Sequence, residues 1–320
     1  MPAPLVSVLI PCFNAAPWIG ETLHSALAQT WRRLEVIVID DGSTDSSLEI
    51  ARSFSDPRIQ VISQSNGGQC AANNHALRLA QGDYFEYLDA DDLLHPEKIE
   101  SQIAQLQSYD PGWVASGAWA RFSRQASEAK FEREAIWQDL DPVSWLVSSW
   151  SGGGMMHGAA WLVPRDIAHR AGPFAEDLTL VNDFDYFSRV LLQSTGVKFC
   201  GEAKTYYRSE IQGSLSAQKS SRAWKSAFDS FTRGTGNLLA RENSERTRQA
   251  AAITFQSFAY SAYPLVPDLI AQAEQRVAEL GGCDRSLRSG ALFNLIVSVF
   301  GWKAARRIQT AWHGWKRNTP

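Results

Sequence analysis

The stretch Tyr87-Leu88-Asp89-Ala90-Asp91-Asp92 places three carboxylates directly after an apolar-rich run that predicts a β-strand. Carboxylates at the end of a strand lie in the crevice where open α/β sheets bind their ligands. Because side chains alternate along a strand, Asp89 and Asp91 project the same way if the extended geometry continues. Such a pair can hold a hard divalent cation against a diphosphate. An acidic helix N-terminus that complements the helix dipole is the alternative interpretation of these residues.

Strand and helix patterns alternate over the first hundred residues. The predicted strands cover 5–10, 34–39, 58–62 and 83–88. The predicted helices cover 17–29, 69–79 and a segment that begins near 96. This βαβα order predicts a doubly wound parallel sheet. Later patterns predict strands at 113–118 and 159–163, a helix at 183–192, and only helices after residue 222.

The composition is that of a globular protein, with 320 residues of which 44% are apolar and 20% are charged. The formal net charge of −3 argues against nucleic acid as a general partner. The four cysteines are widely spaced, so we expect free thiols in a reducing cytosol and no zinc site. We expect no signal peptide and no transmembrane helix, since the best apolar-rich run, 291–302, is shorter than the about 18–20 residues needed to span a bilayer.

A basic segment ends the chain, with seven Lys or Arg and no acidic residue between 285 and 320. Within 291–317 the apolar residues follow helical spacing, and the basic residues fall mainly on the other face. Such a helix suits an anionic membrane surface, which would place a cytoplasmic protein on the inner face of the plasma membrane. The alternative is a terminal helix that packs its apolar stripe on the domain.

Four polar turns end predicted strands or begin the later helix, at 11–14, 40–43, 89–92 and 182–185. The carboxyl ends of parallel strands meet at one edge of a sheet, so these turns predict a nucleotide-sized site. The first turn lacks the glycines of a dehydrogenase GxGxxG motif, and the chain has no GxxxxGK[ST] P-loop. A metal would then have to balance the charge of a diphosphate, which favours the metal-site interpretation of Asp89 and Asp91.

The order and spacing of these motifs resemble glycosyltransferase family 2, which has the GT-A fold and inverts the anomeric centre. The resemblance rests on VSVLIPCFN (6–14), VIDDGSTD (38–45), NGGQCAANN (66–74) and GDYFEYLDADD (82–92) with PEK (96–98). It implies an α/β fold with a doubly wound, mixed but mostly parallel GT-A sheet and a helical C-terminal region. The implied parts are a nucleotide-sugar-binding half at 1–105, an acceptor-binding half with the catalytic base at 106–216, and a helical region with the basic tail at 217–320.

The resemblance also implies roles for individual donor-site residues. Asp41 would accept the uracil imide hydrogen of a donor that we expect to be a UDP-hexose. Asp91 would ligate Mg²⁺ or Mn²⁺ on the diphosphate, with Asp89 on the ribose and metal side. Asn73 stands where many members carry an arginine, so a cationic contact to the nucleotide is lost or supplied elsewhere. The other expected contacts to the nucleotide sugar are Pro11, Cys12, Phe13, Asn14, Gly68, Ala90 and Arg208.

The acceptor is expected to be a glycan or a lipid-linked glycan. Asp183 is the candidate base that deprotonates the acceptor hydroxyl, and the alternative is that Asn182 or Asp183 caps a helix. Family members usually carry Glu or Asp where Asn182 stands. The candidates for acceptor contact are His157, Trp150 and Trp161, each with a purely structural alternative. A non-catalytic nucleotide- or glycan-binding module and a sugar-nucleotide pyrophosphorylase are the competing functions.

Overall fold

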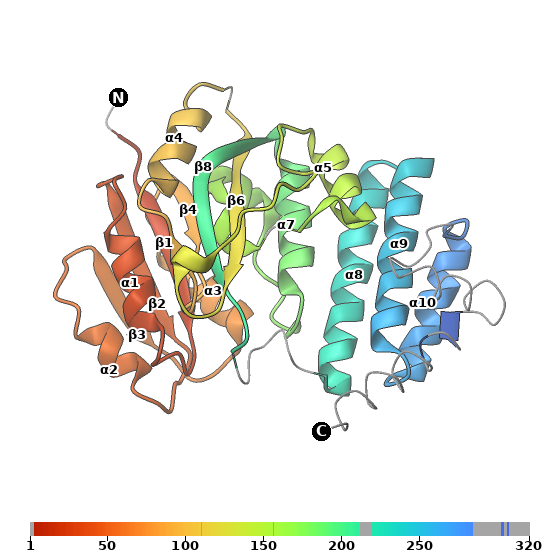
Figure 1. Cartoon of the computed structure of the whole chain (residues 1–320), viewed down its shortest axis with the longest axis horizontal. Helices are drawn as coiled ribbons and strands as arrows, with labels where there is room; N and C mark the ends of the chain where they lie inside the picture. Colours follow the sequence, from red (N-terminus) through yellow and green to blue (C-terminus); the bar gives the residue numbers. More distant parts are fainter. Residues whose placement is uncertain are drawn as a thin grey trace.

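The computed structural model of the chain describes residues 3–109, 111–155, 157–211, 219–283, 302, 303 and 306. Its strands are β1 (Val6–Cys12), β2 (Leu34–Asp40), β3 (Ile59–Ser63), β4 (Tyr84–Tyr87), β5 (Leu93–Leu94), β6 (Trp113–Phe122), β7 (Leu162–Pro164) and β8 (Gly196–Arg208). They form one sheet in the order β3-β2-β1-β4-β7-β6-β8-β5 (Figure 1). The order jumps between non-consecutive strands, as the predicted doubly wound topology requires.

The first half of the sheet is parallel, because β1 pairs with β2 and β4, and β2 pairs with β3. Side chains of β1 and β2 are almost all buried, which matches their near-continuous apolar sequence. The helices of this half are α1 (Ile19–Leu27), α2 (Ser47–Arg52), α3 (Gln69–Leu79) and α4 (Lys98–Leu106). Helices α1, α3 and α4 lie where the sequence pattern predicts helices, and α2 lies in a predicted connection between strands.

The second half makes the sheet mixed. Strand β7 runs antiparallel to β4 and β6, while β6 and β8 are parallel and lie side by side (Figure 1). Because β7 is antiparallel to both β4 and β6, strands β4 and β6 run in the same direction, and β8 is parallel to β6. The carboxyl ends of β4, β6 and β8 therefore face the same edge as those of β1 and β2. The helices of this half are α5 (Pro142–Ser148), α6 (Arg165–Ala171) and α7 (Asn182–Gln193).

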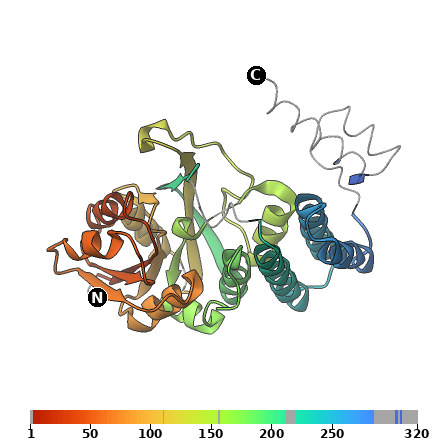
Figure 2. The same cartoon turned by 90° about the horizontal axis from the view of Figure 1, so that it is seen from below.

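Three C-terminal helices, α8 (Ser221–Arg241), α9 (Glu245–Ala262) and α10 (Pro267–Glu279), lie beside α7 and away from β1–β3 (Figure 2). Their cluster of buried phenylalanine and alanine side chains is separate from the two clusters that cover the sheet. Helix α8 supports α7 directly, because Gly234 leaves room for the Phe184 ring and the Phe231 ring lies 4.8 Å from it. The helical region therefore holds the helix that carries Asp183.

Most of the predicted basic tail lies outside the described residues. Of its described residues, Trp302 packs its ring 5.4 Å from that of Tyr263, and Lys303 forms an ion pair of 2.8 Å with Glu274. In the part of the chain that the structure describes, no helix has both the length and the apolar character needed to cross a membrane. The expected boundary of the helical region, between 216 and 217, likewise lies outside the described residues.

Candidate active site

Three of the predicted carboxylates meet at the carboxyl edge of the sheet. Asp89 and Asp91 follow β4, and Asp183 lies in the first turn of α7. The negative charges of Asp91 and Asp183 both act on Asp89, as expected for groups at one edge of the sheet. Helix α4 begins only at Lys98, so the acidic cluster is not a helix N-terminus. The helix-start alternative is therefore wrong, and the metal-site interpretation of this stretch stays a prediction.

The carboxylates repel one another in a poorly hydrated place. Burial, together with the charges of Asp91 and Asp183, raises the pKa of Asp89 to about 7. Burial also raises the pKa of Asp91, although the positive charge of Arg208 opposes that shift. Burial raises the pKa of Asp183 in the same direction. A cation placed among these groups would relieve the repulsion, since it favours their charged forms.

The residues present fit a divalent metal ion. Asp89 and Asp91 offer carboxylate oxygens, the ligands that Mg²⁺ and Mn²⁺ prefer. Among the described residues there is no group of three or more His, Cys, Asp or Glu that would enclose an ion by itself. Sites for Mg²⁺ commonly combine one or two carboxylates with substrate phosphates and waters, which is what this pair of side chains would provide.

Asp41 is buried and already accepts hydrogen bonds from the protein. Its Oδ1 accepts from the backbone N–H of Gly67 at 2.9 Å and from Nε2 of Gln64 at 2.8 Å, and its Oδ2 accepts from the N–H of Gly68 at 2.8 Å. The carboxylate therefore fixes the loop before α3, where Gly68 has a φ of 90°. Its expected contact with a uracil imide stays a prediction.

The neighbouring carboxylate, Asp40, is the one with a free acceptor. Its Oδ2 accepts from the Ser63 hydroxyl at 3.0 Å, whereas its Oδ1 is buried and has no partner. Buried acceptors are rarely left unpaired, so an N–H donor of a ligand at this end of β2 would be favourable. The sequence pattern puts Asp40 in the turn at 40–43 without a role of its own, whereas the structure makes it the last residue of β2.

The turn after β1 is tied to the turn after β2. The Oδ1 of Asn14 accepts from the backbone N–H of Thr44 at 2.8 Å, and the N–H of Asn14 donates to the Ser43 hydroxyl at 3.0 Å. Phe13 is held half-exposed between them, with 50% of its surface accessible. Burial raises the pKa of the Cys12 thiol to about 12, so this group is not a nucleophile.

Gln69 joins the donor side to the helix of the candidate base. It is the first residue of α3, and its Nε2 donates to Oδ1 of Asp89 at 2.8 Å while its Oε1 accepts from Nδ2 of Asn182 at 3.0 Å. Neither Asn182 nor Asp183 caps α7, because the N-cap position is Val181. Asp183 instead accepts at Oδ1 from the backbone N–H of Phe184 at 2.9 Å within the first turn, so its role as a base stays a prediction. The side chain of Asn182 serves this bridge.

A second buried group lies behind Asp91. Asp92 is fully buried, accepts from the backbone N–H of Arg208 at 2.8 Å, and lies 3.6 Å from Nδ1 of His157. Burial raises the pKa of Asp92 and lowers the pKa of His157 to about 3. Arg208 also donates to the carbonyl of Asp91 at 2.9 Å and pairs with Glu21 at 2.6 Å. Arg208 thus braces the acidic turn from the side on which a diphosphate is expected.

The remaining predicted residues divide into core and edge positions. Trp161 is fully buried against Phe187 and Trp145, so no sugar can reach its ring and the core-packing alternative holds. Trp150 is half-buried and stacks at 4.3 Å on Phe184, the residue next to Asp183. The side chains that lie buried beside the edge are Asn73, Ala90 and His157.

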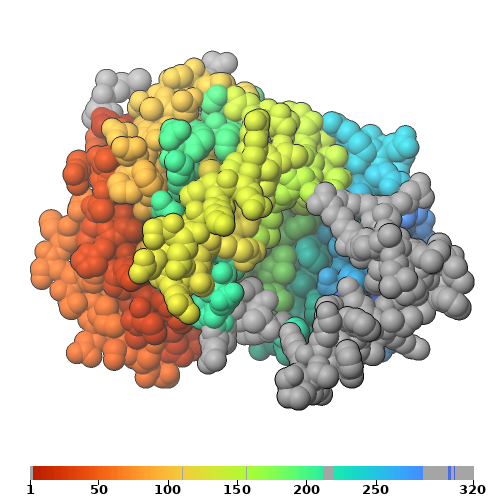
Figure 3. Space-filling view, in the orientation of Figure 1, coloured from red at the N-terminus to blue at the C-terminus, as the bar shows by residue number. Residues whose placement is uncertain are grey.

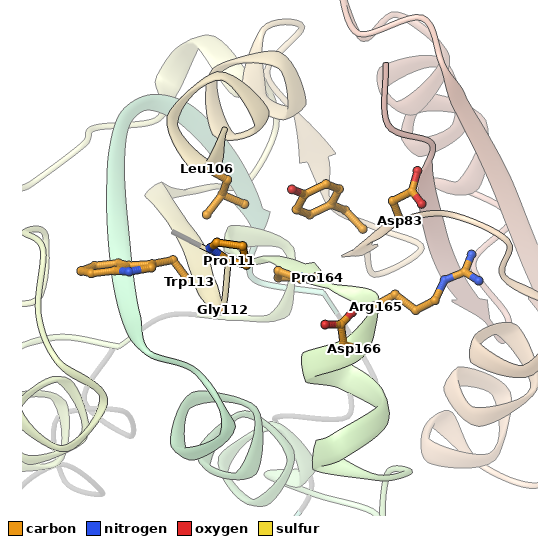
Figure 4. Close-up of a pocket in the computed structure, with 9 residues that line it drawn as sticks. Asp83, Leu106, Pro111, Gly112, Trp113, Pro164, Arg165 and Asp166 are labelled. Atoms are coloured by element: carbon orange, nitrogen blue, oxygen red, sulfur yellow. The ribbon is translucent and has the colours of Figure 1, made fainter. Parts of the chain in front are cut away.

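Two pockets lie away from the carboxylates. The first, of about 310 Å³, is lined at the opposite edge of the sheet by the starts of β4 and β6 and the end of β7 (Figure 4). The second, of about 890 Å³, is more open and lies along α2 next to Ser43 and Thr44. Neither pocket contains Asp89, Asp91 or Asp183. Ligands of doubly wound sheets bind at the carboxyl edge, so chemistry is assigned to the carboxylates rather than to these pockets.

The sheet order and the flanking helices are those of the GT-A fold. Residues 7–168, just over half of the chain, match the family model Glycosyl transferase family 2, and the chain belongs to that family. An uncharacterized glycosyltransferase of Rickettsia typhi is 33% identical over 201 residues, which cover 60% of this chain and 60% of the relative. The chain thus spans less than two thirds of that relative's length.

Two solved structures share the fold. Residues 1–349 of S. aureus TarS, in complex with UDP-GlcNAc, superpose with a TM-score of 0.63 at 16% identity, over 86% of this chain and 88% of that one. The mannosyltransferase PcManGT from Pyrobaculum calidifontis, in complex with GDP-Man and Mn²⁺, has a TM-score of 0.54 at 19% identity, over 96% of this chain and 83% of that one. The expected GT-A fold with C-terminal helices is thereby confirmed.

Proposed function

We propose that this protein is a metal-assisted, inverting glycosyltransferase. It moves a hexose from a UDP donor to a hydroxyl of a glycan or a lipid-linked glycan. The observation that carries this proposal is the convergence of Asp89, Asp91 and Asp183 at the carboxyl edge, next to the turns that end β1 and β2. The UDP-GlcNAc bound to TarS and the Mn²⁺ bound to PcManGT support a nucleotide-sugar donor and a metal.

We infer from the order of the strands that the two substrates bind on opposite sides of Asp91. The nucleobase would lie at the ends of β1 and β2, where Phe13 is exposed and Oδ1 of Asp40 lacks a partner. The acceptor would approach from β6 and β8, on the other side of Asp91. We assign 1–105 to the donor, 106–216 to the acceptor and the base, and 217–320 to the support of α7.

The carboxylates would divide the chemistry between them. Asp89 and Asp91 would hold Mg²⁺ or Mn²⁺, which acts as a Lewis acid on the departing diphosphate. Asp183 would take the proton of the acceptor hydroxyl as its oxygen attacks the anomeric carbon and the bond to the diphosphate breaks. A base performs best when its pKa lies near the working pH, and burial raises the pKa of Asp183 in that direction. Attack opposite the leaving group inverts the anomeric centre.

A thermal-shift screen of UDP and UDP-hexoses with and without Mn²⁺ tests the donor assignment, since binding to the folded state raises the melting temperature. We expect stabilisation that needs Mn²⁺ and that Asp91→Asn removes. If no nucleotide changes the melting temperature, with or without Mn²⁺, the proposal is contradicted. Tight UDP binding without transfer to any acceptor would favour the non-catalytic module, and release of pyrophosphate rather than UDP would favour the pyrophosphorylase.

Placement at the membrane stays a prediction from the sequence. We propose a cytoplasmic protein whose segment 291–317 contacts the inner face of the plasma membrane, where a lipid-linked acceptor would be found. Flotation with anionic liposomes, comparing the full chain with one that ends at Gly290, tests this placement. Equal and negligible flotation of both would contradict it.

A further inference from the structure

Arg121 is an exposed cation near the end of β6 that stacks on two aromatic rings. Its guanidinium carbon lies 5.4 Å from the centre of the Trp119 ring and 4.8 Å from that of Tyr207. Within the described ranges it has no hydrogen-bond or ion-pair partner, although its charge acts on the carboxyl of Glu134. A guanidinium held on aromatic faces keeps its charge and its fork of N–H donors, and it loses little freedom when it binds a planar anion.

This cluster lies on the acceptor side of the carboxylates. Arg121 is opposite Tyr207 in the parallel register of β6 and β8, at the carboxyl ends of both strands. The His157 ring lies 5.6 Å from the Trp119 ring and 5.4 Å from that of Tyr207, and its Nδ1 is 3.6 Å from Asp92. The rings therefore extend from the acidic turn toward solvent, on the side opposite β1 and β2. The segment after β6, yellow in Figure 3, lies at the surface on this face.

Glu134 holds the Trp119 ring in place. Its Oε2 accepts from the indole N–H of Trp119 at 3.3 Å and from the backbone N–H of Met155 at 3.2 Å. Gly154 packs so closely that a Cβ there would meet Oε2 of Glu134 at 2.5 Å. Met155, held by the same carboxylate, is exposed over 47% of its surface. The orientation of the Trp119 ring is therefore set before any ligand arrives.

We propose that Arg121, Trp119 and Tyr207 form the acceptor subsite and that this subsite selects a saccharide bearing an anionic group, a carboxylate or a phosphate. The rings of Trp119 and Tyr207 hold the guanidinium in place, and the guanidinium forms paired hydrogen bonds with the anion. An unpaired cation beside an edge rich in carboxylates attracts the anion that the edge would otherwise repel. The proposal rests on the glycosyltransferase function proposed above.

The test follows the Trp119 indole N–H by NMR, with the signal assigned by its loss in Trp119→Phe. The full chain is titrated with methyl glucuronide, glucose 6-phosphate, methyl glucoside and inorganic phosphate. We expect both anionic sugars to shift the signal with affinities about tenfold higher than that of methyl glucoside, the effect of one paired, charge-assisted contact. A preference for one of the two identifies the anion as carboxylate or phosphate. Arg121→Ala should remove the advantage, whereas the matched change Arg124→Ala, at another exposed arginine, should keep it.

Equal affinities for methyl glucoside and the anionic sugars would overturn the proposal, as would equal effects of Arg121→Ala and Arg124→Ala. A response to inorganic phosphate as strong as that to glucose 6-phosphate would show an adventitious ion only. The same samples are tested for stabilisation by UDP and Mn²⁺. If UDP and Mn²⁺ do not stabilise the unchanged protein, the result counts against the proposed transferase. If they do stabilise it but anionic sugars bind no better than methyl glucoside, the result counts against the subsite alone.

Discussion

The Nε2 atom of Gln69 donates a hydrogen bond of 2.8 Å to Oδ1 of Asp89, and this bond ties the first turn of α3 to the acidic turn after β4. The same amide accepts a hydrogen bond from Asn182, the residue before the candidate base. Asp41 in turn fixes the loop that leads into Gln69. One amide therefore sets the relative position of a metal-side carboxylate and the start of α7.

We predict that Gln69→Leu lowers the turnover number for transfer by about tenfold, as is typical when a hydrogen bond that orients a metal-binding carboxylate is lost. The affinity for UDP in the presence of Mn²⁺ should fall as well, because Gln69 orients Asp89 on the expected ribose and metal side. In a double-mutant cycle, Asn182→Ala should add little to Gln69→Leu. Gln81→Leu, at an exposed glutamine, is the matched control. Additive effects, or equal losses from the control, would refute the bridge.

The first half of the fold could be predicted because its signals are local. Buried parallel strands have near-continuous apolar sequences, and α3 covers Gln69–Leu79 as the pattern predicted. The acidic turns also follow directly from sequence, since each ends a strand or begins a helix. The position of Asp89 and Asp91 beside the turns after β1 and β2 follows from the rule that parallel strands share one carboxyl edge. Asp183 lies in the first turn of a helix, and its role was implied by the family resemblance.

Strand β8 was missed because its sequence lacks a clean alternation. Gly201 and Glu202 are exposed in its middle, and the register with β6 shifts between Gly117 and Ala118. Such an irregularity disturbs the two-residue period on which strand prediction depends. Gln69 and Arg121 were missed for another reason. Their partners are distant in sequence, as in the 113 residues that separate Gln69 from Asn182, so only the folded chain reveals them.

The stability of the metal-free protein should depend on pH through Asp89. Its pKa is raised to about 7 by burial and neighbouring charges, so between about pH 4 and 7 the folded state binds more protons than the unfolded state. Stability then falls as pH rises through this window. We expect Asp89→Asn to weaken that fall in urea denaturation series, and Mn²⁺ to stabilise the protein more at pH 7.5 than at pH 5.5. Parallel pH profiles for both proteins would contradict this assignment.

Substitution of Trp161 distinguishes a role in core packing from a role in sugar binding. We expect Trp161→Ala to destabilise the protein by about 3–5 kcal/mol, the usual cost of removing a large aromatic side chain from a core. Trp150→Ala should cost less, because the Trp150 ring is only half-buried on Phe184. Urea unfolding measures both changes. A Trp161→Ala variant of unchanged stability with impaired acceptor binding would show that the core assignment is wrong.

The central claim is that Asp183 is the base of a metal-assisted sugar transfer. The most direct measurement compares the unchanged protein with Asp183→Asn, using UDP release from a UDP-hexose in the presence of Mn²⁺ and binding of UDP to the same samples. We predict a loss of at least about a hundredfold in UDP release, as is typical for removal of a general base, with UDP binding retained. Full activity of Asp183→Asn would contradict the account.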